Sequence, residues 1–392
     1  MLATALTTLP AAAGPLAPTG VRVSLPVPTG PYRVGETTLH LIDRGRPDPW
    51  VSNPPYRELM VSLFYPAAVT YPGPSAPYML DGAAAHFDAV DTNTYLGLGL
   101  PTGQVDWAFT ATHATLNAPV DRRADKLPVV LYSPGLGEPR TWSTTLVEQL
   151  ASAGYLVVTI DNTYESPEVE FPDGRLALLG GAEPTVSWVG KMMDTRVADT
   201  SFVLDQLAGV TAAGLHGRID PHAVGMFGHS AGGFATAAAM AADPRIKAGI
   251  NLDGKMGLNP LDPNADLSPV AQHGLDRPFL LMGSGSPGGE SITNDASWAS
   301  FWAHSTGWKA DLTLTGSRHA SFTDAEVLLP QLVGPLRLDP AAVRDDIGTL
   351  DPECALRTVN RYIGEFFDRF LRHRGGGFLD DPAPAYPIAR IG

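Results

Sequence analysis

Residues 223–242 read AVGMFGHSAGGFATAAAMAA, and this stretch decides the fold. Its first five residues are apolar and predict a buried strand, whereas Ser230–Ala242 favours a helix. Between them stands Gly228-His229-Ser230-Ala231-Gly232, a G-x-S-x-G pattern. A strand–turn–helix context makes this turn sharp and strained, and glycines flank the serine because a Cβ there would collide with neighbouring backbone. The serine hydroxyl then stands at a helix N-terminus, where developing negative charge is favoured.

The placement of this pattern predicts Ser230 as a catalytic nucleophile. The alternative interpretation is a glycine-rich packing turn. His229 is expected to be a packed or hydrogen-bonded neighbour of the turn and not a base, because its side chain points away from Ser230 when the turn is regular.

Apolar strands alternate with helical segments on both sides of this stretch. Such alternation predicts a parallel sheet covered by helices on both faces, and therefore an α/β protein of the α/β-hydrolase fold. Its chemistry is expected just beyond the carboxyl ends of the strands. The other expected strands are Tyr32–Asp43, Glu58–Tyr65, Leu127–Ser133, Tyr155–Asp161, Ile246–Leu252, Phe279–Gly283 and Ala310–Leu314. The other expected helices are Thr141–Ala153, Arg196–Leu207 and Pro352–His373.

We expect one domain over residues 21–375, followed by a tail, 376–392. Residues 67–125 lack regular periodicity and are rich in Gly, Pro, Ala and Thr, so they are interpreted as an insertion with short helices and as a candidate lid. Residues 1–20 are interpreted as a signal remnant or a disordered N-terminus, because Met1–Leu9 is apolar and Pro10-Ala11-Ala12-Ala13-Gly14 resembles a signal cleavage region. The basic region of a signal is missing. A secreted protein is expected, with a cytoplasmic one as the alternative.

A serine nucleophile needs a base, and histidine has a pKa suited to neutral pH. In this fold the base follows the nucleophile along the chain. His319 follows the last central strand in the short loop Gly316-Ser317-Arg318-His319, which predicts it as the base; the alternative is a surface loop histidine. The other histidines fit less well: His273 precedes a strand, His304 lies in a helical stretch and His373 ends the last helix.

The acid that orients the imidazole has three candidates. Asp253 directly ends the strand Ile246–Leu252, whereas Glu290 and Asp295 follow Phe279–Gly283, the commoner position of the acid in this fold. Physical reasoning leaves these alternatives open. The apolar approach and Gly254 favour Asp253, because a residue at a strand end is rigidly placed.

The oxyanion of a tetrahedral intermediate needs two backbone N–H donors. One is expected from Ala231, the residue after the nucleophile. The second is expected from Leu136 in the loop Ser133-Pro134-Gly135-Leu136-Gly137, where glycines allow close approach of the backbone; the alternative is a plain glycine-rich turn.

Composition narrows the function classes. The chain of 392 residues carries a net charge of −14 and no basic cluster, so neither nucleic acid nor an anionic membrane surface is an expected partner. No apolar run is long enough for a membrane span. The single cysteine, Cys354, allows no intrachain disulfide and has no sequence context of a nucleophile. No metal and no cofactor are expected, because no metal-ligand motif is present and a serine triad works without one. The oligomeric state is left open.

These pieces together resemble the plasma-type platelet-activating-factor acetylhydrolases and their bacterial α/β-hydrolase relatives, over most of residues 30–375. The resemblance rests on residues 133–137, the turn at Ser230, Asn251-Leu252-Asp253 and the loop 316–319. It implies Asp253 as the acid and supports Leu136 and Ala231 as oxyanion donors. It also implies helices within Leu338–Leu371. Two departures concern the substrate: Pro134 stands where that family commonly has His, and Ala231 stands where larger residues occur.

The expected function is a serine esterase that forms an acyl-enzyme, with a small-molecule or lipid ester as substrate. The resemblance implies short acyl esters, including phospholipids similar to platelet-activating factor. A polyester or cutin-type esterase or a lipase is the alternative, and a non-catalytic binding protein of the same fold is the alternative from another class. Trp298, Trp302 and Trp308 are expected to pack in the core and not to line an aromatic cleft.

Overall fold

The computed structural model describes residues 20–91, 96–181, 185–262, 265–286, 289–375, 377–380, 386–390 and 392. The predicted signal remnant, 1–20, lies outside the described residues except for Gly20. No helix in the described ranges combines the length and the apolar character needed to cross a membrane.

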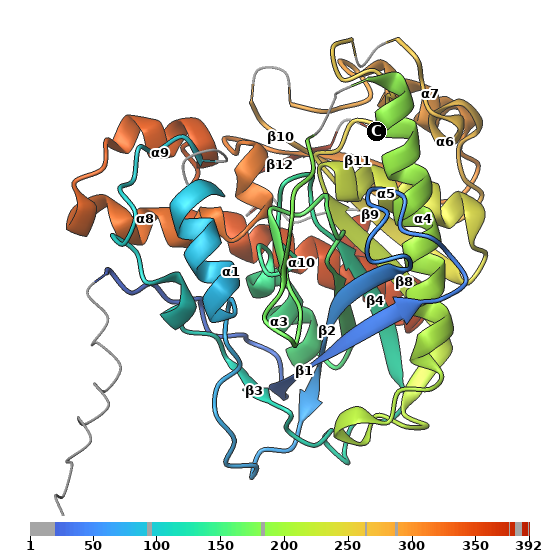
Figure 1. Ribbon diagram of the computed structural model, residues 1–392. Helices are drawn as coiled ribbons and strands as arrows, with labels where there is room; N and C mark the ends of the chain where they lie inside the picture. The colour runs from blue at the N-terminus through green and yellow to red at the C-terminus, as the bar shows by residue number, and fades with distance from the viewer. Residues whose placement is uncertain are drawn as a thin grey trace, which may run out of the picture.

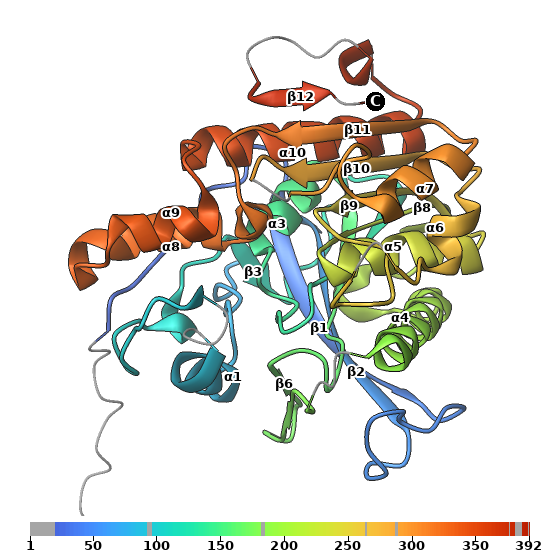
Figure 2. The same ribbon diagram turned by 90° about the horizontal axis from the view of Figure 1, so that it is seen from above.

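A ten-stranded sheet forms the centre of the molecule, in the order β12-β11-β10-β9-β8-β4-β5-β2-β1-β3 (Figures 1 and 2). The middle of the sheet, from β5 to β11, is parallel, and β2 and β12 join its two sides in antiparallel pairing. The central strands are buried on both sides because nearly every residue in them is apolar. The strands are β1 Arg33–Asp43, β2 Arg57–Ala67, β3 Ala114–Leu116, β4 Leu127–Ser133, β5 Leu156–Ile160, β8 Ile219–His229, β9 Ile246–Leu252, β10 Phe279–Ser284, β11 Lys309–Leu314 and β12 Ile388–Arg390, with a separate hairpin of β6 Glu168–Glu170 and β7 Leu176–Leu178.

Helices cover both faces of the sheet (Figure 2). α3 (Thr144–Ser152) and α10 (Pro352–Leu371) pack on one face, where the side chains of α10 join one apolar cluster with β8 and β9. The opposite face is covered by a second apolar cluster with helices α4 Val186–Leu207, α5 Ala231–Ala242, α6 Pro269–His273 and α7 Ala296–His304. The predicted α/β-hydrolase fold, with a mostly parallel sheet between two helical layers, is thereby confirmed.

A third apolar cluster lies at one end of the sheet and joins the insertion to the C-terminal half of the chain. It contains side chains of α1 (Asp81–His86), α8 (Ala325–Leu336) and α9 (Pro340–Ile347). Asp324 ties these parts together, because its carboxylate accepts hydrogen bonds from Tyr78 and from two backbone amides at the start of α3. The short helical turns are η1 Phe87–Asp91, η2 Trp107–Phe109, η3 Ala212–Gly214, η4 His319–Phe322 and η5 Gly377–Leu379.

Three of the differences between the structure and the sequence-based expectations concern α4, α8 and the C-terminal segment. α4 begins at Val186 and not at Arg196, and the Thr185 hydroxyl caps it by accepting from the Trp188 amide at 3.2 Å. α8 was not expected, since Pro330 and Pro335 interrupt its sequence pattern. Part of the segment expected to be a tail forms β12, which pairs with β11 at the edge of the sheet.

Buried carboxyl groups make the stability of this fold depend on pH. Burial raises the pKa of Glu148 to about 8 and that of Asp324 to about 6. A raised folded-state pKa means that the folded protein binds more protons than the unfolded chain, whose carboxyl groups titrate near pH 4. The stability contributed by these groups is therefore complete below about pH 4 and is lost as the pH rises through about 6 to 8.

We expect the Tm of the protein to fall between pH 5 and pH 8.5, and Glu148→Gln to make that fall smaller. Gln keeps an oxygen for the two amides of His113 and Ala114, at 2.9 and 2.8 Å, but cannot ionise. Differential scanning calorimetry across this range is the measurement, with Glu353→Gln, whose side chain is 87% exposed, as the matched control. An equal fall in Tm for wild type and Glu148→Gln would contradict the assignment.

Candidate active site

The turn at Ser230 joins β8 to α5 and has the strained backbone that its sequence predicts. Ser230 has φ 53° and ψ −122°, a backbone conformation that residues other than glycine rarely adopt. Its neighbours must be small: a Cβ on Gly228 would lie 2.3 Å from the carbonyl carbon and oxygen of Gly232, and one on Gly232 would lie 1.9 Å from the Ser133 carbonyl oxygen. The close approach of the end of β4 to the first turn of α5 thus depends on these glycines.

Gly232→Ala is expected to destabilise the protein by about 2–4 kcal/mol, because the added methyl group must push the end of β4 away from α5. Equilibrium urea unfolding measures this change. Gly364→Ala is the matched control, since a Cβ on this glycine of α10 meets nothing within 4 Å, and a stability gain of about 0.5–1 kcal/mol is expected there. Equal stability of Gly232→Ala and wild type would contradict the tight packing of the turn.

The structure brings Asp253 and His319 together from the ends of two strands. Asp253 follows β9 and His319 follows β11, and the His319 Nδ1 lies 2.7 Å from the Asp253 Oδ2. The other carboxylate oxygen, Oδ1, accepts the backbone amide of Ser284 at 2.7 Å. Asp253 is buried, whereas half of the His319 side chain is exposed. In a serine triad, a buried carboxylate likewise holds one imidazole nitrogen and leaves the other for reaction.

The charge of Asp253 is stabilised at its position. Burial alone would raise the pKa of this carboxyl, but the hydrogen bond and charge of His319 outweigh burial, so that the pKa lies below its ordinary value. Asp253 also has a φ of 56°, in the left-handed region. The strained turn directs the carboxylate to His319 immediately after β9 ends.

Ser230 lies at the same edge of the sheet as Asp253 and His319. The Ser230 amide donates to the carbonyl oxygen of Leu252 at 2.8 Å, and a Cβ on Gly254 would lie 2.1 Å from the Ser230 carbonyl oxygen. His229 reaches the third loop, since its Nε2 lies 2.9 Å from the His319 carbonyl oxygen. The residues that follow β8, β9 and β11 therefore form one contiguous cluster.

The alternative acids occupy other positions. Asp295 caps α7, where its carboxylate accepts from the Trp298 amide at 2.9 Å and from the Ser297 hydroxyl. Glu290 lies near the cluster, but its carboxylate faces the Lys255 Nζ at 3.6 Å. Burial, together with the nearby charge of Asp253, raises the pKa of Glu290 to about 8. Neither group has a hydrogen bond to His319 among the described residues.

The alternative bases are also placed elsewhere. His273 and His304 end α6 and α7, and each Nδ1 lies close to a backbone carbonyl oxygen of its own helix. His373 follows α10 with a φ of 54° and is exposed.

The loop predicted to supply an oxyanion donor follows β4. The Gly135 amide donates to the Glu138 carboxylate at 2.6 Å, and the Gly137 amide donates to the Glu165 carbonyl oxygen at 3.0 Å. Within the described part of the chain, the amides of Leu136 and Ala231 make no hydrogen bond. They are the two donors that the sequence predicts for the oxyanion, and the loop geometry leaves both available.

Three buried charged residues that were not predicted from the sequence support this loop: Glu138, Glu165 and Arg196. The Arg196 guanidinium donates to the Pro134 carbonyl oxygen at 2.6 Å and pairs with Glu165 at 2.7 Å. One carboxylate oxygen of Glu138 accepts from the Gly135 amide, and the other lies 2.7 Å from the His229 Nδ1. The prediction that His229 is a hydrogen-bonded neighbour of the turn is confirmed, since it is fully buried and both ring nitrogens have partners.

The three tryptophans pack as predicted. Trp298 is fully buried and donates from Nε1 to the Gly254 carbonyl oxygen at 2.8 Å, which supports the turn after Asp253. Trp302 and Trp308 are half-buried against the two apolar clusters that cover the faces of the sheet.

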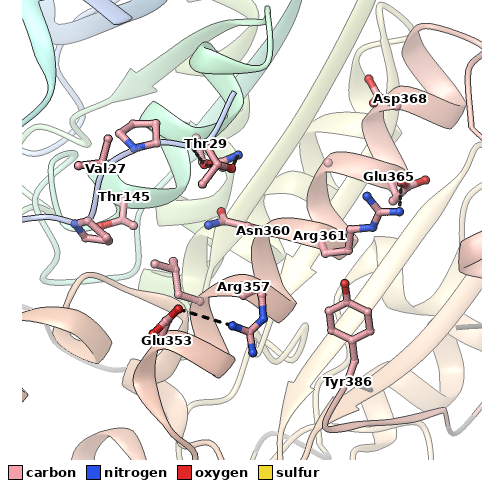
Figure 3. A pocket seen from close by; sticks show the side chains of 15 residues that line it. Val27, Thr29, Thr145, Glu353, Arg357, Asn360, Arg361, Glu365, Asp368 and Tyr386 are labelled. Atoms are coloured by element: carbon pink, nitrogen blue, oxygen red, sulfur yellow. Dashed lines mark hydrogen bonds and ion pairs between the residues drawn. The ribbon is translucent and has the colours of Figure 1, made fainter. Parts of the chain in front are cut away.

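A separate surface cavity of about 510 Å³ lies between α3, α10 and the segment 26–29 (Figure 3). Two ion pairs along α10 line it, Arg357 with Glu353 and Arg361 with Glu365. None of the predicted site residues lines it. In the described ranges, no group of three or more His, Cys, Asp or Glu side chains is arranged to hold a metal ion.

Fold and site together define a carboxylic ester hydrolase of the α/β-hydrolase class. The chain matches the family described as platelet-activating factor acetylhydrolase, isoform II, over residues 21–170 and 193–374, and it belongs to that family. It is 29% identical over 384 residues to a probable 1-alkyl-2-acetylglycerophosphocholine esterase of Arthroderma benhamiae, and the match covers 93% of this chain and 92% of that protein. Among solved structures it is similar to a ferulic acid esterase from Streptomyces cinnamoneus, with 33% identity and a TM-score of 0.73, over 94% of this chain and 99% of the other. The family resemblance inferred from the sequence is confirmed.

Proposed function

We propose that the protein hydrolyses esters through an acyl-enzyme on Ser230, with His319 as the base and Asp253 as the acid. The observation that carries this proposal is the 2.7 Å contact between Asp253 and His319 at the edge of the sheet where the strained Ser230 turn lies. In this mechanism the Ser230 Oγ attacks the ester carbonyl while the His319 Nε2 takes its proton. The Leu136 and Ala231 amides stabilise the oxyanion.

The second half of the reaction uses the same groups in reverse. His319 returns the proton to the leaving alcohol, an acyl-enzyme remains, and His319 then activates water to release the acid. Asp253 holds the His319 Nδ1 proton throughout and stabilises the imidazolium, because it is buried and already paired with that nitrogen.

We propose short acyl esters as the substrate class, with lipid esters similar to platelet-activating factor among them. The support is family membership together with the relative from Arthroderma benhamiae, whose described activity concerns a 2-acetyl ester. The similarity to a ferulic acid esterase gives aryl-substituted acyl esters as the second candidate. A small residue at Ala231, next to the nucleophile, is compatible with these bulkier acyl groups.

The test is a comparison of kcat/KM across p-nitrophenyl esters from acetyl to palmitoyl, a 2-acetyl ether phospholipid and methyl ferulate. The first proposal expects the acetyl esters to be cleaved fastest. A preference for methyl ferulate would favour the second candidate, and a preference for palmitoyl would favour the lipase alternative. Absence of turnover on every ester would contradict the esterase proposal.

We also propose that the protein is exported, on the basis of the apolar start and the Pro10–Gly14 segment. Mass spectrometry of the N-terminus of the protein from its native source tests this. A mature chain that begins after residues 10–14 is expected, and an intact Met1 in the native protein would contradict export by cleavage.

A further inference from the structure

Residues of three loops are joined by one buried chain of hydrogen bonds behind the proposed site. It runs from the Gly135 amide to the Glu138 carboxylate, at 2.6 Å, and from there to the His229 Nδ1, at 2.7 Å. It continues from the His229 Nε2 to the His319 carbonyl oxygen, at 2.9 Å. Its first end lies beside Leu136, its middle beside Ser230, and its last end on His319 itself.

The hydrogen positions in this chain are fixed by its ends. A carbonyl oxygen only accepts, so the His229 Nε2 donates to His319. The Gly135 amide only donates, so one Glu138 oxygen accepts. The remaining proton lies between the second Glu138 oxygen and the His229 Nδ1, which makes the two groups an ion pair or its neutral equivalent. The charge and hydrogen bond of Glu138 outweigh burial and raise the pKa of His229, which favours the ion pair.

Packing alone does not account for this pair. The side chains of Glu138 and His229 are 1% and 0% exposed, and burial of charged groups is costly unless every polar atom has a partner. A pair of apolar side chains would fill the same volume, but it would leave the buried Gly135 amide without an acceptor and the His319 carbonyl without its donor. The chain of bonds therefore serves to hold backbone groups in place.

We propose that the Glu138–His229 pair is a positioning device that sets the oxyanion loop and the His319 loop relative to one another. This inference rests on the proposed function, because it assigns Leu136 and His319 the roles given there. In this role neither Glu138 nor His229 takes part in a bond-making or bond-breaking step. A second contact of the His229 ring supports the role: it packs on the His319 ring with centroids 4.4 Å apart.

Glu138→Gln tests the proposal. A carboxylate offers two acceptor oxygens, whereas Gln offers one oxygen and one NH₂ group. The Gln oxygen can still accept from the Gly135 amide, but the NH₂ group can only donate to the Nδ1 of an uncharged His229. The charge-assisted bond between the two side chains is then replaced by a weaker neutral one, while volume is retained. We expect kcat on the best p-nitrophenyl ester to fall about 10- to 100-fold, with KM changed by less than about threefold, because the ground state does not use the oxyanion donors.

A transition-state analogue separates positioning from general damage. An aryl trifluoromethyl ketone forms a tetrahedral adduct with the serine, so its Ki should rise in Glu138→Gln by the factor by which kcat/KM falls. Glu148→Gln is the matched control: Glu148 is also fully buried and accepts two backbone amides, but it contacts neither loop, so wild-type kcat and Ki are expected. Where Glu138→Gln fails to fold, His229→Gln tests the same chain.

The outcomes are distinct. A kcat within about threefold of wild type in Glu138→Gln, or a loss of kcat with an unchanged Ki, would overturn the positioning role. The same loss of kcat in Glu148→Gln would also overturn it, because the change of any buried carboxyl group would then suffice. Failure of the proposed function is recognised separately, since Ser230→Ala would then keep its activity.

Discussion

Ser230→Ala is expected to lower kcat by about 10⁶-fold, because removal of the nucleophile of a serine triad costs about that much in subtilisin. The physical reason is the loss of the oxygen atom that forms the acyl-enzyme in the proposed mechanism. The turn itself should survive, since a methyl group occupies less space than a hydroxymethyl group and the strained backbone is set by Gly228 and Gly232. The oxyanion amides would still give a residual rate over water of about 10³–10⁴-fold.

The measurement is kcat on the best ester of the panel, with circular dichroism and Tm to verify folding. Ser201→Ala is the matched control: Ser201 lies on α4, bonds the Asp243 carboxylate at 3.0 Å and is remote from the turn. Wild-type kcat is expected there. A Ser230→Ala variant with more than about 1% of wild-type kcat would exclude Ser230 as the nucleophile.

The second large effect is expected for Asp253→Asn, with a loss of about 10⁴-fold in kcat by analogy with the same change in a serine protease triad. The Asp253 Oδ2 faces the His319 Nδ1 and the Oδ1 accepts the Ser284 amide, so both oxygens are used as acceptors. An amide supplies one acceptor only. Its NH₂ group then faces either Ser284 or His319, and in the second case it stabilises the tautomer that cannot take the Ser230 proton.

Glu290→Gln is the control that separates the two candidate acids. At pH 7 the Glu290 carboxyl is mostly protonated, because its pKa is raised to about 8, and Gln resembles that uncharged form. A kcat within about threefold of wild type is expected at pH 7 for Glu290→Gln. A large loss in this variant, together with an active Asp253→Asn, would move the role of the acid from Asp253 to Glu290.

Much of the fold could be predicted from the sequence because its central strands are short apolar runs that end at polar residues. β4 and β9 have the predicted bounds, and Ser230, Asp253 and His319 follow strands in the order that the fold requires. Such residues are predictable because strand ends of a parallel sheet meet at one edge.

The features that could not be predicted from the sequence have physical reasons as well. α8 contains two prolines that interrupt its helical sequence pattern, although its apolar side chains pack against the insertion and α9. The Arg196 contact that supports the predicted oxyanion loop could not be predicted from the sequence. Arg196 lies 62 positions from its partner Pro134, and buried charged residues follow no periodic sequence pattern. Neither of these two features changes the predicted site residues.

The most direct test of the central claim is covalent labelling with an alkyl fluorophosphonate followed by peptide mass spectrometry. The reagent loses fluoride when an activated serine oxygen attacks its phosphorus, so only a nucleophile with a functioning base reacts quickly. The account predicts one adduct per chain, on Ser230, with labelling absent in Ser230→Ala and strongly slowed in His319→Ala. An adduct on another residue of the wild type, or rapid labelling that persists in Ser230→Ala, would contradict it.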